Sequence, residues 1–381
     1  MLEVQKLLEA KVSSGLSELQ AFECLNTELG IKVKHYEDKG ITLLDYDQID
    51  SPKSHPIVIE CRSLILYTDD FQLVSMKFPR FFNLGENPEY YKDFDWKKSI
   101  VFEKLDGSLV GVYCLQGNWY ISTRGMAFAE GNNQLGDGTF QQDIIEAFGL
   151  SSYDEFNERF KSFYDEAFTF IFEYCSPRNK VVTPYDKPIM VLTGITNRDD
   201  DSNYCLGDLK CSCWKMKEVS GLNVRLPEIY DFNDIDNLVK KANELEGLKE
   251  GFVVWDEATN KRCKIKSSTY VLAHSLRGND PVPTRKNLLK LVFTGEVDEF
   301  VSYFPEWKDD VDSVLLEVET FKVNLNETYD KVKHLESQKD FALAVKDTHG
   351  NAFLFSARKQ NKTVNQVIAE CPADKLINLF V

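Results

Sequence analysis

The chain lacks long apolar runs and an early apolar signal segment. No apolar stretch approaches the roughly 20 residues that are needed to cross a bilayer. The first residues, Met1-Leu2-Glu3-Val4, place an acidic side chain where a signal peptide would be basic or apolar. These absences predict a soluble intracellular protein with no membrane partner.

Disulfide and metal spacings are also lacking. The nine cysteines are scattered along the chain, which in an intracellular protein favours reduced thiols. Cys205, Cys211 and Cys213 lie close in sequence and raise a zinc site as an alternative. No Cys-x-x-Cys pair and no nearby histidine accompany them, so ordinary thiols are the favoured interpretation.

Positive charge is scarce. The chain has 45 Lys and Arg against 61 Asp and Glu, a net charge of −16. Phosphate contacts need cations, so this balance argues against tight nonspecific binding to long nucleic acid. The run from Lys261 to Lys266 is nevertheless strongly basic, and a local positive cleft can exist in an acidic protein.

The length of 381 residues and a hydrophobic content of 43% predict about two domains with packed cores. Ser17 and Gln20 form a capping-box pattern within a helical first thirty residues, and Gly30 is a typical helix stop. Apolar spacing predicts strands at 31–36, 41–46, 57–67, 71–78, 101–104, 109–113, 119–123, 168–174, 189–195, 250–255 and 262–265, with helices over 139–163 and 235–245.

The pattern becomes purely helical after about residue 268. Apolar residues recur every three or four positions from Val311 to Leu335, which predicts a long amphipathic helix. Segments 287–303 and 362–380 are also predicted to be helical, and 278–283 is a candidate joint. The sequence therefore predicts a mixed domain over 1–267 and an all-helical domain over 268–381.

The most informative run is Lys104-Leu105-Asp106-Gly107-Ser108, between two predicted strands. We expect a hairpin here, with the glycine allowing a tight turn and the lysine pointing into the space that the strands enclose. An Asp-Gly pair alone is also an ordinary hairpin turn, so the run needs support from the rest of the chain.

Other charged residues lie within or at the ends of predicted strands. They are Arg62 in Glu60-Cys61-Arg62, Glu173 in Phe172-Glu173-Tyr174, Glu250 before Gly251, and the pair Lys264 and Lys266 on one face of a strand. Each has an ordinary interpretation; an alternating lysine pair, for example, often protects an edge strand. Their combination and order point to a shared site.

This order resembles the covalent nucleotidyltransferases, which comprise ATP-dependent DNA and RNA ligases and messenger-RNA capping enzymes. It is most similar to the ATP-dependent RNA ligase 1 (tRNA-repair) family of the T-even bacteriophages. The resemblance rests on Glu60-Cys61-Arg62, the run from Phe81 to Pro88, Lys104 to Val110, Lys264 to Ser267, and Tyr270-Val271. Arg80 and Arg124 stand where that family has lysine, and Leu109 stands where DNA ligases and capping enzymes commonly have arginine.

The resemblance implies an α+β fold: a ligase-type nucleotidyltransferase (adenylyltransferase) domain with antiparallel sheets, followed by an all-α C-terminal domain that docks RNA or tRNA. It implies joining of 5′-phosphate and 3′-hydroxyl RNA ends through lysyl-AMP and an AMP-capped RNA end. ATP would be the substrate and Mg²⁺ or Mn²⁺ the metal. It further implies cleaved tRNA as the natural RNA, a polynucleotide kinase-phosphatase as a functional partner, a monomer, and the cytoplasm (of the host, if a phage encodes the chain).

The resemblance also assigns roles. Lys104 is the nucleophile, and its pKa must be depressed by Lys264, Lys266 and a metal because an ammonium cannot attack. Lys264 and Lys266 would also stabilise the phosphate. The remaining roles are phosphate contacts for Arg62, Arg80 and Tyr270, close backbone approach for Gly107 and Gly251, and metal or ribose contacts, largely through water, for Asp106, Glu173 and Glu250.

Two other functions remain open from the sequence. One is a DNA ligase or capping-type enzyme, although the predicted helical tail differs from the β-barrel of those proteins. The other is a noncatalytic protein that binds RNA ends or tRNA on the same fold.

Overall fold

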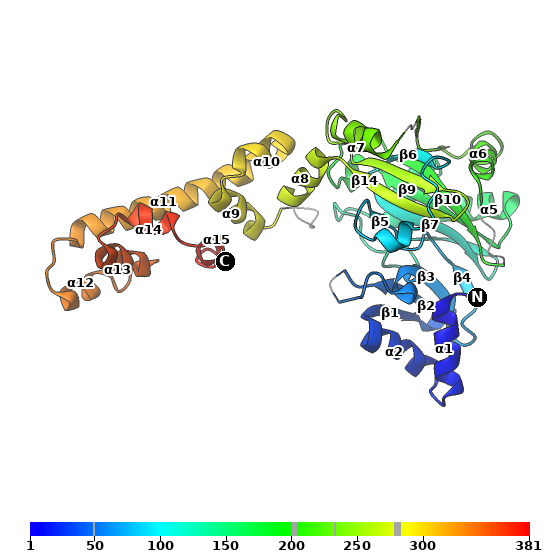
Figure 1. Cartoon of the computed structure of the whole chain (residues 1–381), viewed down its shortest axis with the longest axis horizontal. Coiled ribbons are helices and arrows are strands. Elements are labelled where there is room, and N and C mark those ends of the chain that lie inside the picture. The colour runs from blue at the N-terminus through cyan, green and yellow to red at the C-terminus, as the bar shows by residue number, and fades with distance from the viewer. Residues whose placement is uncertain (49, 200–203, 232–233, 278–282) are drawn as a thin grey trace. The chain divides into compact units, whose positions relative to one another are not determined.

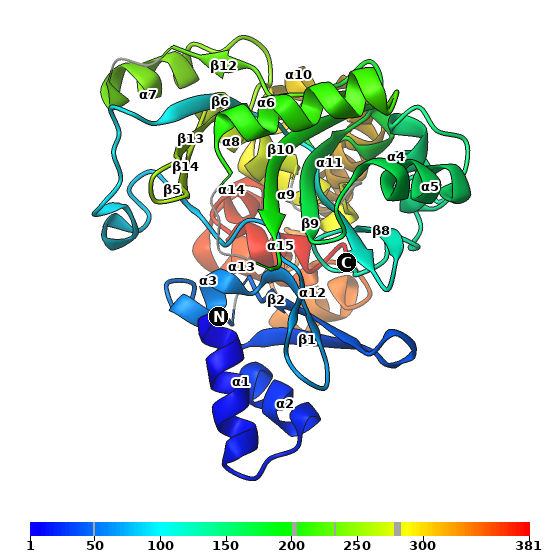
Figure 2. The ribbon, with the colours of Figure 1, turned by 90° about the vertical axis from the view of Figure 1, so that its right-hand side faces the viewer.

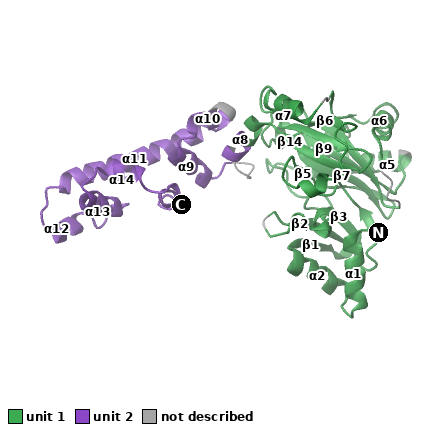
Figure 3. Ribbon diagram, viewed as in Figure 1, with its two compact units in different colours: residues 1–271 green, residues 272–381 purple. Residues whose placement is uncertain are grey.

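The computed structural model describes residues 1–48, 50–199, 204–231, 234–277 and 283–381. These residues form two compact units, Met1–Val271 and Leu272–Val381, shown in Figure 3. The division lies within helix α8 (Ser268–Arg277) rather than before it. Most of the joint predicted over 278–283 lies outside the described residues.

The first unit begins with two helices on a four-stranded sheet (Figure 1). The helices are α1 (Glu3–Ser13) and α2 (Glu18–Leu29), and the strands, in sheet order, are β1 (Ile31–Tyr36), β2 (Ile41–Tyr46), β3 (Arg62–Tyr67) and β4 (Leu73–Ser75). Ser17 caps α2 by accepting from the Gln20 amide, as predicted. Leu64 and Leu66 face the helices, whereas Ile65 packs on the opposite face with Tyr113.

The strand predicted over 57–67 is wrong in its first part. Pro56 opens a short helix, α3 (Pro56–Glu60), because its fixed φ suits a first helical position. The Glu60 carboxylate accepts from the amides of Glu3 (3.0 Å) and Val4 (2.9 Å), so it closes the start of α1. The strand predicted over 71–78 is likewise reduced to β4.

Two five-stranded sheets form the rest of the first unit. One has the order β11-β10-β9-β7-β8 and the other the order β12-β6-β13-β14-β5. The bounds are β5 (Phe82–Asn83), β6 (Ile100–Lys104), β7 (Ser108–Leu115), β8 (Asn118–Ser122), β9 (Phe168–Cys175), β10 (Ile189–Asn197), β11 (Val224–Arg225), β12 (Ile229–Tyr230), β13 (Gly251–Asp256) and β14 (Lys261–Lys266). Antiparallel pairing dominates; β10 with β11 and β14 with β5 are parallel.

Helices cover the outer faces of these sheets. Figure 2 shows α4 (Phe140–Ala147), α5 (Tyr153–Phe163) and α6 (Leu206–Trp214) beside the sheet that contains β9. Helix α7 (Ile235–Asn243) contacts β13 and β14 of the other sheet. Each sheet has its own apolar core beneath its helices. The opposite, inner face of each sheet is therefore available to form a site.

The hairpin predicted around Asp106-Gly107 is wrong. Strands β6 and β7 belong to different sheets, and residues 105–107 cross from one sheet to the other. Gly107 is needed for close approach rather than for a turn, because a Cβ here would lie 2.3 Å from the Tyr174 carbonyl oxygen. Alternating apolar residues on both sides are common to a hairpin and to such a crossing, and this is why the two were confused.

The second unit is all-helical. Its helices are α9 (Arg285–Thr294), α10 (Val297–Tyr303), α11 (Lys308–Val332), α12 (Gln338–Val345), α13 (Asn351–Gln360), α14 (Val364–Ala369) and α15 (Ala373–Ile377). The predicted amphipathic stripe is buried along α11, where Phe321 and Leu325 join the core of this unit. The α+β fold class with a helical C-terminal part is confirmed. Among the described residues, no helix combines the length and apolarity that a bilayer crossing requires.

Candidate active site

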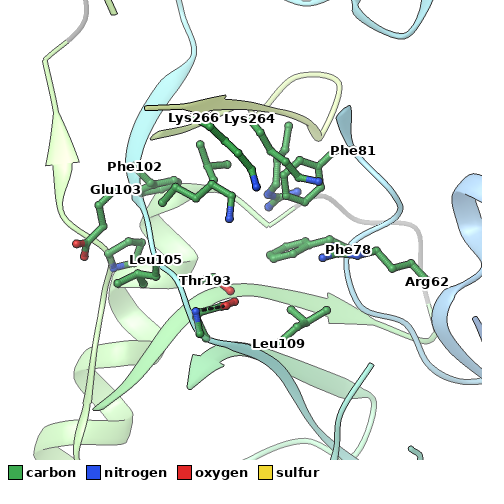
Figure 4. A pocket seen from close by; sticks show the side chains of 16 residues that line it. Arg62, Phe78, Phe81, Phe102, Glu103, Leu105, Leu109, Thr193, Lys264 and Lys266 are labelled. Atoms are coloured by element: carbon green, nitrogen blue, oxygen red, sulfur yellow. Dashed lines mark hydrogen bonds between the residues drawn. The ribbon is translucent and has the colours of Figure 1, made fainter. Parts of the chain in front are cut away.

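A cavity of about 240 Å³ lies in the first unit, with walls from both five-stranded sheets and from β3. Six predicted site residues line it: Arg62, Lys104, Gly107, Glu173, Lys264 and Lys266. Figure 4 shows Lys264 and Lys266 reaching into it from their strand, with Arg62 pointing inward from the side opposite Glu103. Strands distant in sequence thus bring one set of charges together.

Glu250 lies between two of the lysines. Its carboxylate is 2.8 Å from Lys104 Nζ and 3.0 Å from Lys266 Nζ, and the residue is only 4% exposed. The strand register explains this arrangement, because Gly251 pairs with Lys104 on β6 and with Lys266 on β14. A side chain at 251 would not fit: φ is +138°, and a Cβ would lie 2.0 Å from the Ile265 carbonyl oxygen.

The pKa of Lys104 differs from the prediction. Burial lowers it, but the Glu250 carboxylate, assisted by Glu173, outweighs burial, so the pKa of Lys104 is raised above its ordinary value. The prediction attributed a depressed pKa to Lys264, Lys266 and a metal together, and the two lysines alone do not outweigh the carboxylates. The physical reason is the buried Glu250 carboxylate, which lies between Lys104 and Lys266. The sequence pattern did not predict that Glu250 would contact both lysines.

Lys264 has the depressed pKa instead. Burial, reinforced by Arg62, Lys104 and Lys266, lowers the pKa of Lys264 to about 6. Its ammonium nitrogen lies 4.5 Å from the centroid of the Phe81 ring. An anion entering the cavity would raise this pKa again by supplying the missing counter-charge.

Glu173 projects from β9 toward the crossing segment. Its carboxylate accepts the Gly107 amide at 3.2 Å. Burial raises the pKa of Glu173 to about 7, with Lys104 opposing and Glu250 reinforcing that shift. A half-buried carboxylate near cations and beside a second carboxylate can hold a divalent metal or a ribose hydroxyl.

Asp106 and Tyr270 do not line the cavity. The Asp106 carboxylate accepts from the amides of Val182 and Thr183, both at 2.7 Å, and from the Tyr270 hydroxyl, also at 2.7 Å. Oδ2 accepts from both amides and Oδ1 accepts from the Tyr270 hydroxyl, so both carboxylate oxygens already have partners within the protein. The aspartate fastens the crossing segment to the chain around 182–183 and to α8.

Arg80 and Arg124, which replace family lysines, stack near Tyr46. Their guanidinium carbons lie 5.2 Å and 4.5 Å from the ring centroid. Arg80 pairs with Glu86 at 2.5 Å, and Arg124 pairs with Asp45 at 3.0 Å. Neither lines the cavity, so the structure does not place the predicted phosphate ligand Arg80 in the cavity wall.

Sequence reasoning missed Arg262. It lines the cavity, with its guanidinium carbon 3.9 Å from the Phe78 ring centroid and 4.8 Å from that of Trp255. Burial lowers the pKa of Arg262 to about 9. The available signal was alternation, since a residue two before Lys264 lies on the same face of a strand.

The described residues hold no preformed cluster of three His, Cys, Asp or Glu side chains that could bind a metal. The zinc alternative has no support there, because Cys205 and Cys211 are exposed while Cys213 is buried. Glu173 and Glu250 still suit Mg²⁺ or Mn²⁺, because magnesium is commonly held by one or two carboxylates together with waters and substrate phosphates.

Comparison with known proteins identifies the family. A family model described as RNA ligase matches residues 60–270, more than half of the chain. The chain belongs to the RNA ligase family. This confirms the resemblance drawn from the Lys104 run and the strand-end charges.

Individual relatives agree with the family. The chain is 34% identical over 289 residues to a protein of Autographa californica nuclear polyhedrosis virus assigned as a bifunctional polynucleotide kinase/RNA ligase. That match covers 73% of this chain and 39% of the relative, so the chain spans well under half of it. The chain is also 25% identical to an RNA ligase of Rhodothermus phage RM378, covering 82% of this chain and 85% of that protein.

Among solved structures, the chain is similar to Naegleria gruberi RNA ligase with pyrophosphate. The identity is 17% and the TM-score 0.41, with 53% of this chain and 58% of that chain covered.

Proposed function

We propose that this chain is an ATP-dependent RNA ligase that joins 5′-phosphate and 3′-hydroxyl RNA ends through a lysyl-AMP intermediate. One observation carries the proposal: Lys104, Glu173, Lys264, Lys266 and Arg62 line one cavity, and the Glu250 carboxylate pairs with Lys104. A lysine is the nucleophile that such an enzyme needs, and the surrounding cations match a triphosphate. All these groups come from one chain, so a monomer suffices.

In the first step, Lys104 Nζ attacks the α-phosphorus of ATP. The nitrogen–phosphorus bond forms, the bond from that phosphorus to the bridging oxygen breaks, and pyrophosphate leaves. Lys104 must first lose a proton and release Glu250, because its protonation and this ion pair keep the amine unreactive. Lys264, Lys266 and Arg62 face the charge that builds on the phosphates.

A divalent cation held by Glu250 and Glu173 would supply positive charge to the phosphates and compete with Lys104 for the Glu250 carboxylate. The AMP then passes to the RNA 5′-phosphate, and the 3′-hydroxyl of a second end displaces it. Asp106 is a positioning residue in this scheme. Its three hydrogen bonds fix the segment that follows Lys104.

The natural RNA is proposed to be cleaved tRNA in the host cytoplasm. Ends left by cleavage need a 5′-phosphate and a 3′-hydroxyl before joining, so a kinase-phosphatase would act first. The name of the baculovirus relative, which couples a polynucleotide kinase to an RNA ligase, supports such a functional link.

The test is a two-stage assay. The chain is mixed with ATP labelled in the α-phosphate and with Mg²⁺, and the protein is analysed by gel and by mass spectrometry of its peptides. Labelled protein is then offered matched RNA and DNA strands with 5′-phosphate and 3′-hydroxyl ends. We expect AMP on Lys104 and sealing of RNA ends. Sealing of DNA alone would indicate a DNA ligase, and no label under any metal condition would indicate a noncatalytic RNA-end binder.

Residues 272–381 are proposed to dock the RNA. Each unit has its own apolar core, so a chain ending at 271 should keep the cavity residues in place. We expect this truncation to retain at least half of the lysine adenylylation rate and to join cleaved tRNA about tenfold more slowly, because docking contacts contribute to binding and positioning. Quantitative joining assays on tRNA and on a short linear RNA measure the effect. Equal tRNA joining by both chains would contradict the docking role.

A further inference from the structure

Strand β3 contains a bulge directly after Arg62. In the pairing with β2, Leu64 lies opposite Leu44 and Arg62 opposite Asp45, which leaves Ser63 as the extra residue. Ser63 adopts φ +58°, a left-handed conformation that is uncommon for a residue with a side chain. Bulges of this kind re-aim side chains beside functional sites.

The bulge changes which way Arg62 points. Leu64 and Leu66 face the core under α1 and α2, and regular alternation would place Arg62 on that same apolar face. The extra residue reverses the alternation, and Arg62 lines the cavity instead. Its Nη1 is buried with no hydrogen-bond partner among the described residues, which leaves a donor for an anion.

A buried lysine holds this bulge. Lys77 Nζ donates to Ser63 Oγ at 2.6 Å and to the Thr123 carbonyl oxygen at 3.3 Å, and Ser63 Oγ donates to the same carbonyl at 2.8 Å. Lys77 is completely buried. The three groups form a closed network that ties β3 to the end of β8.

The fold makes room for this lysine. A Cβ on Gly111 of β7 would lie 2.5 Å from Lys77 Cε and 2.8 Å from Ser122 Oγ, so a side chain at 111 would displace the lysine from this position. Both hydrogen-bond partners of the ammonium are uncharged, and burial, with Arg62 adding to it, lowers the pKa of Lys77 to about 7. Burying a cation without a paired acid costs free energy, so its presence is better explained by positioning than by stability.

We infer that Lys77 is a positioning residue that, through Ser63, locks the β3 bulge and thereby aims Arg62 at the phosphates of the nucleotide. The inference rests on the proposed function, because it takes the ligand of the cavity to be a nucleoside triphosphate. Lys77 itself does not line the cavity and acts only through Arg62.

A double-mutant cycle tests the inference. The dissociation constant of α,β-methylene-ATP, which cannot transfer AMP, is measured by calorimetry for the wild-type chain, Arg62→Ala, Lys77→Met and the double variant. We expect about a tenfold weaker binding in each single variant, since a charge-assisted hydrogen bond is lost or misaligned. The double variant should bind no more weakly than Arg62→Ala, because Lys77 has nothing left to position.

Ser63→Gly keeps the inference testable if Lys77→Met does not fold. Glycine accepts φ +58° but removes the hydroxyl that Lys77 holds, so the same loss and the same lack of additivity are expected. Lys98→Met, at a lysine side chain that is 86% exposed, is the control and should bind like the wild type. The inference would be overturned if the losses of affinity in Lys77→Met and Arg62→Ala multiplied in the double variant. Unchanged binding in Lys77→Met and Ser63→Gly would overturn it as well.

The wild-type chain separates the two claims. If it takes up AMP on lysine while the cycle shows no coupling, only the lock is refuted. If it takes up no AMP under any metal condition, the proposed function is refuted whatever the coupling.

Discussion

Lys104→Ala will take up no AMP when it is mixed with labelled ATP and Mg²⁺. The loss should exceed about a thousandfold, because a covalent intermediate cannot form without its nucleophile and the neighbouring residues cannot replace it. Lys264 and Lys266 line the same cavity, yet they come from β14, which strand β13 separates from the Lys104 strand. We therefore expect no transfer of the label to either of them.

Two further variants make this result specific. Lys104→Arg keeps a cation beside Glu250 but should be as inactive as the alanine variant, since arginine is always protonated. Lys98→Ala removes an exposed lysine outside the cavity and should label normally. Label retained by Lys104→Ala, located by peptide mass spectrometry on another residue, would remove Lys104 from its proposed role.

Glu250→Gln will lose metal-dependent adenylylation by at least about a hundredfold while remaining folded. The amide keeps the shape of the side chain but removes the charge that pairs with Lys104 and Lys266. Breaking a buried pair of this kind costs about 3 kcal/mol of unfolding free energy. Activity should fall further than stability explains, because a glutamine also binds a divalent metal poorly.

The opposite outcome has a clear meaning. Without Glu250, Lys104 loses the main contact that raises its pKa, so the amine would become easier to deprotonate. If Glu250→Gln adenylylates faster than the wild type at neutral pH, the carboxylate only restrains Lys104 and does not hold the metal. Rates measured across a Mg²⁺ titration, with unfolding followed by circular dichroism, distinguish the two roles.

Local patterns predicted the parts of the fold that depend on neighbouring residues. The Ser17 cap, the strands over 250–255 and 262–265 and the buried stripe of α11 follow from short-range rules. The short helix α3 did not, because five residues opened by a proline carry too little periodicity to compete with the apolar pattern around them.

The sequence predicted which residues form the site better than it predicted how those residues contact one another. Charged residues beside apolar runs marked five of the residues that line the cavity, and Gly107 next to Asp106 marked a sixth. Their interactions depend on which strands pair, and the register of Gly251 with both Lys104 and Lys266 cannot be read from spacing. Arg262 was missed because the basic run from Lys261 to Lys266 offers several cations as candidates, and Lys77 was missed because a single cation between apolar residues resembles an ordinary surface residue.

The crossing segment at residues 105–107 has a mechanical consequence. Lys104 ends a strand of one sheet and Ser108 begins a strand of the other, and three residues provide almost no slack between them. Any sliding of one sheet against the other must shift the Lys104 amine relative to Glu173, which belongs to the second sheet. Heating should therefore misalign the reacting groups while most of the backbone hydrogen bonding is still intact, so enzymatic turnover would fail at a lower temperature than the secondary structure.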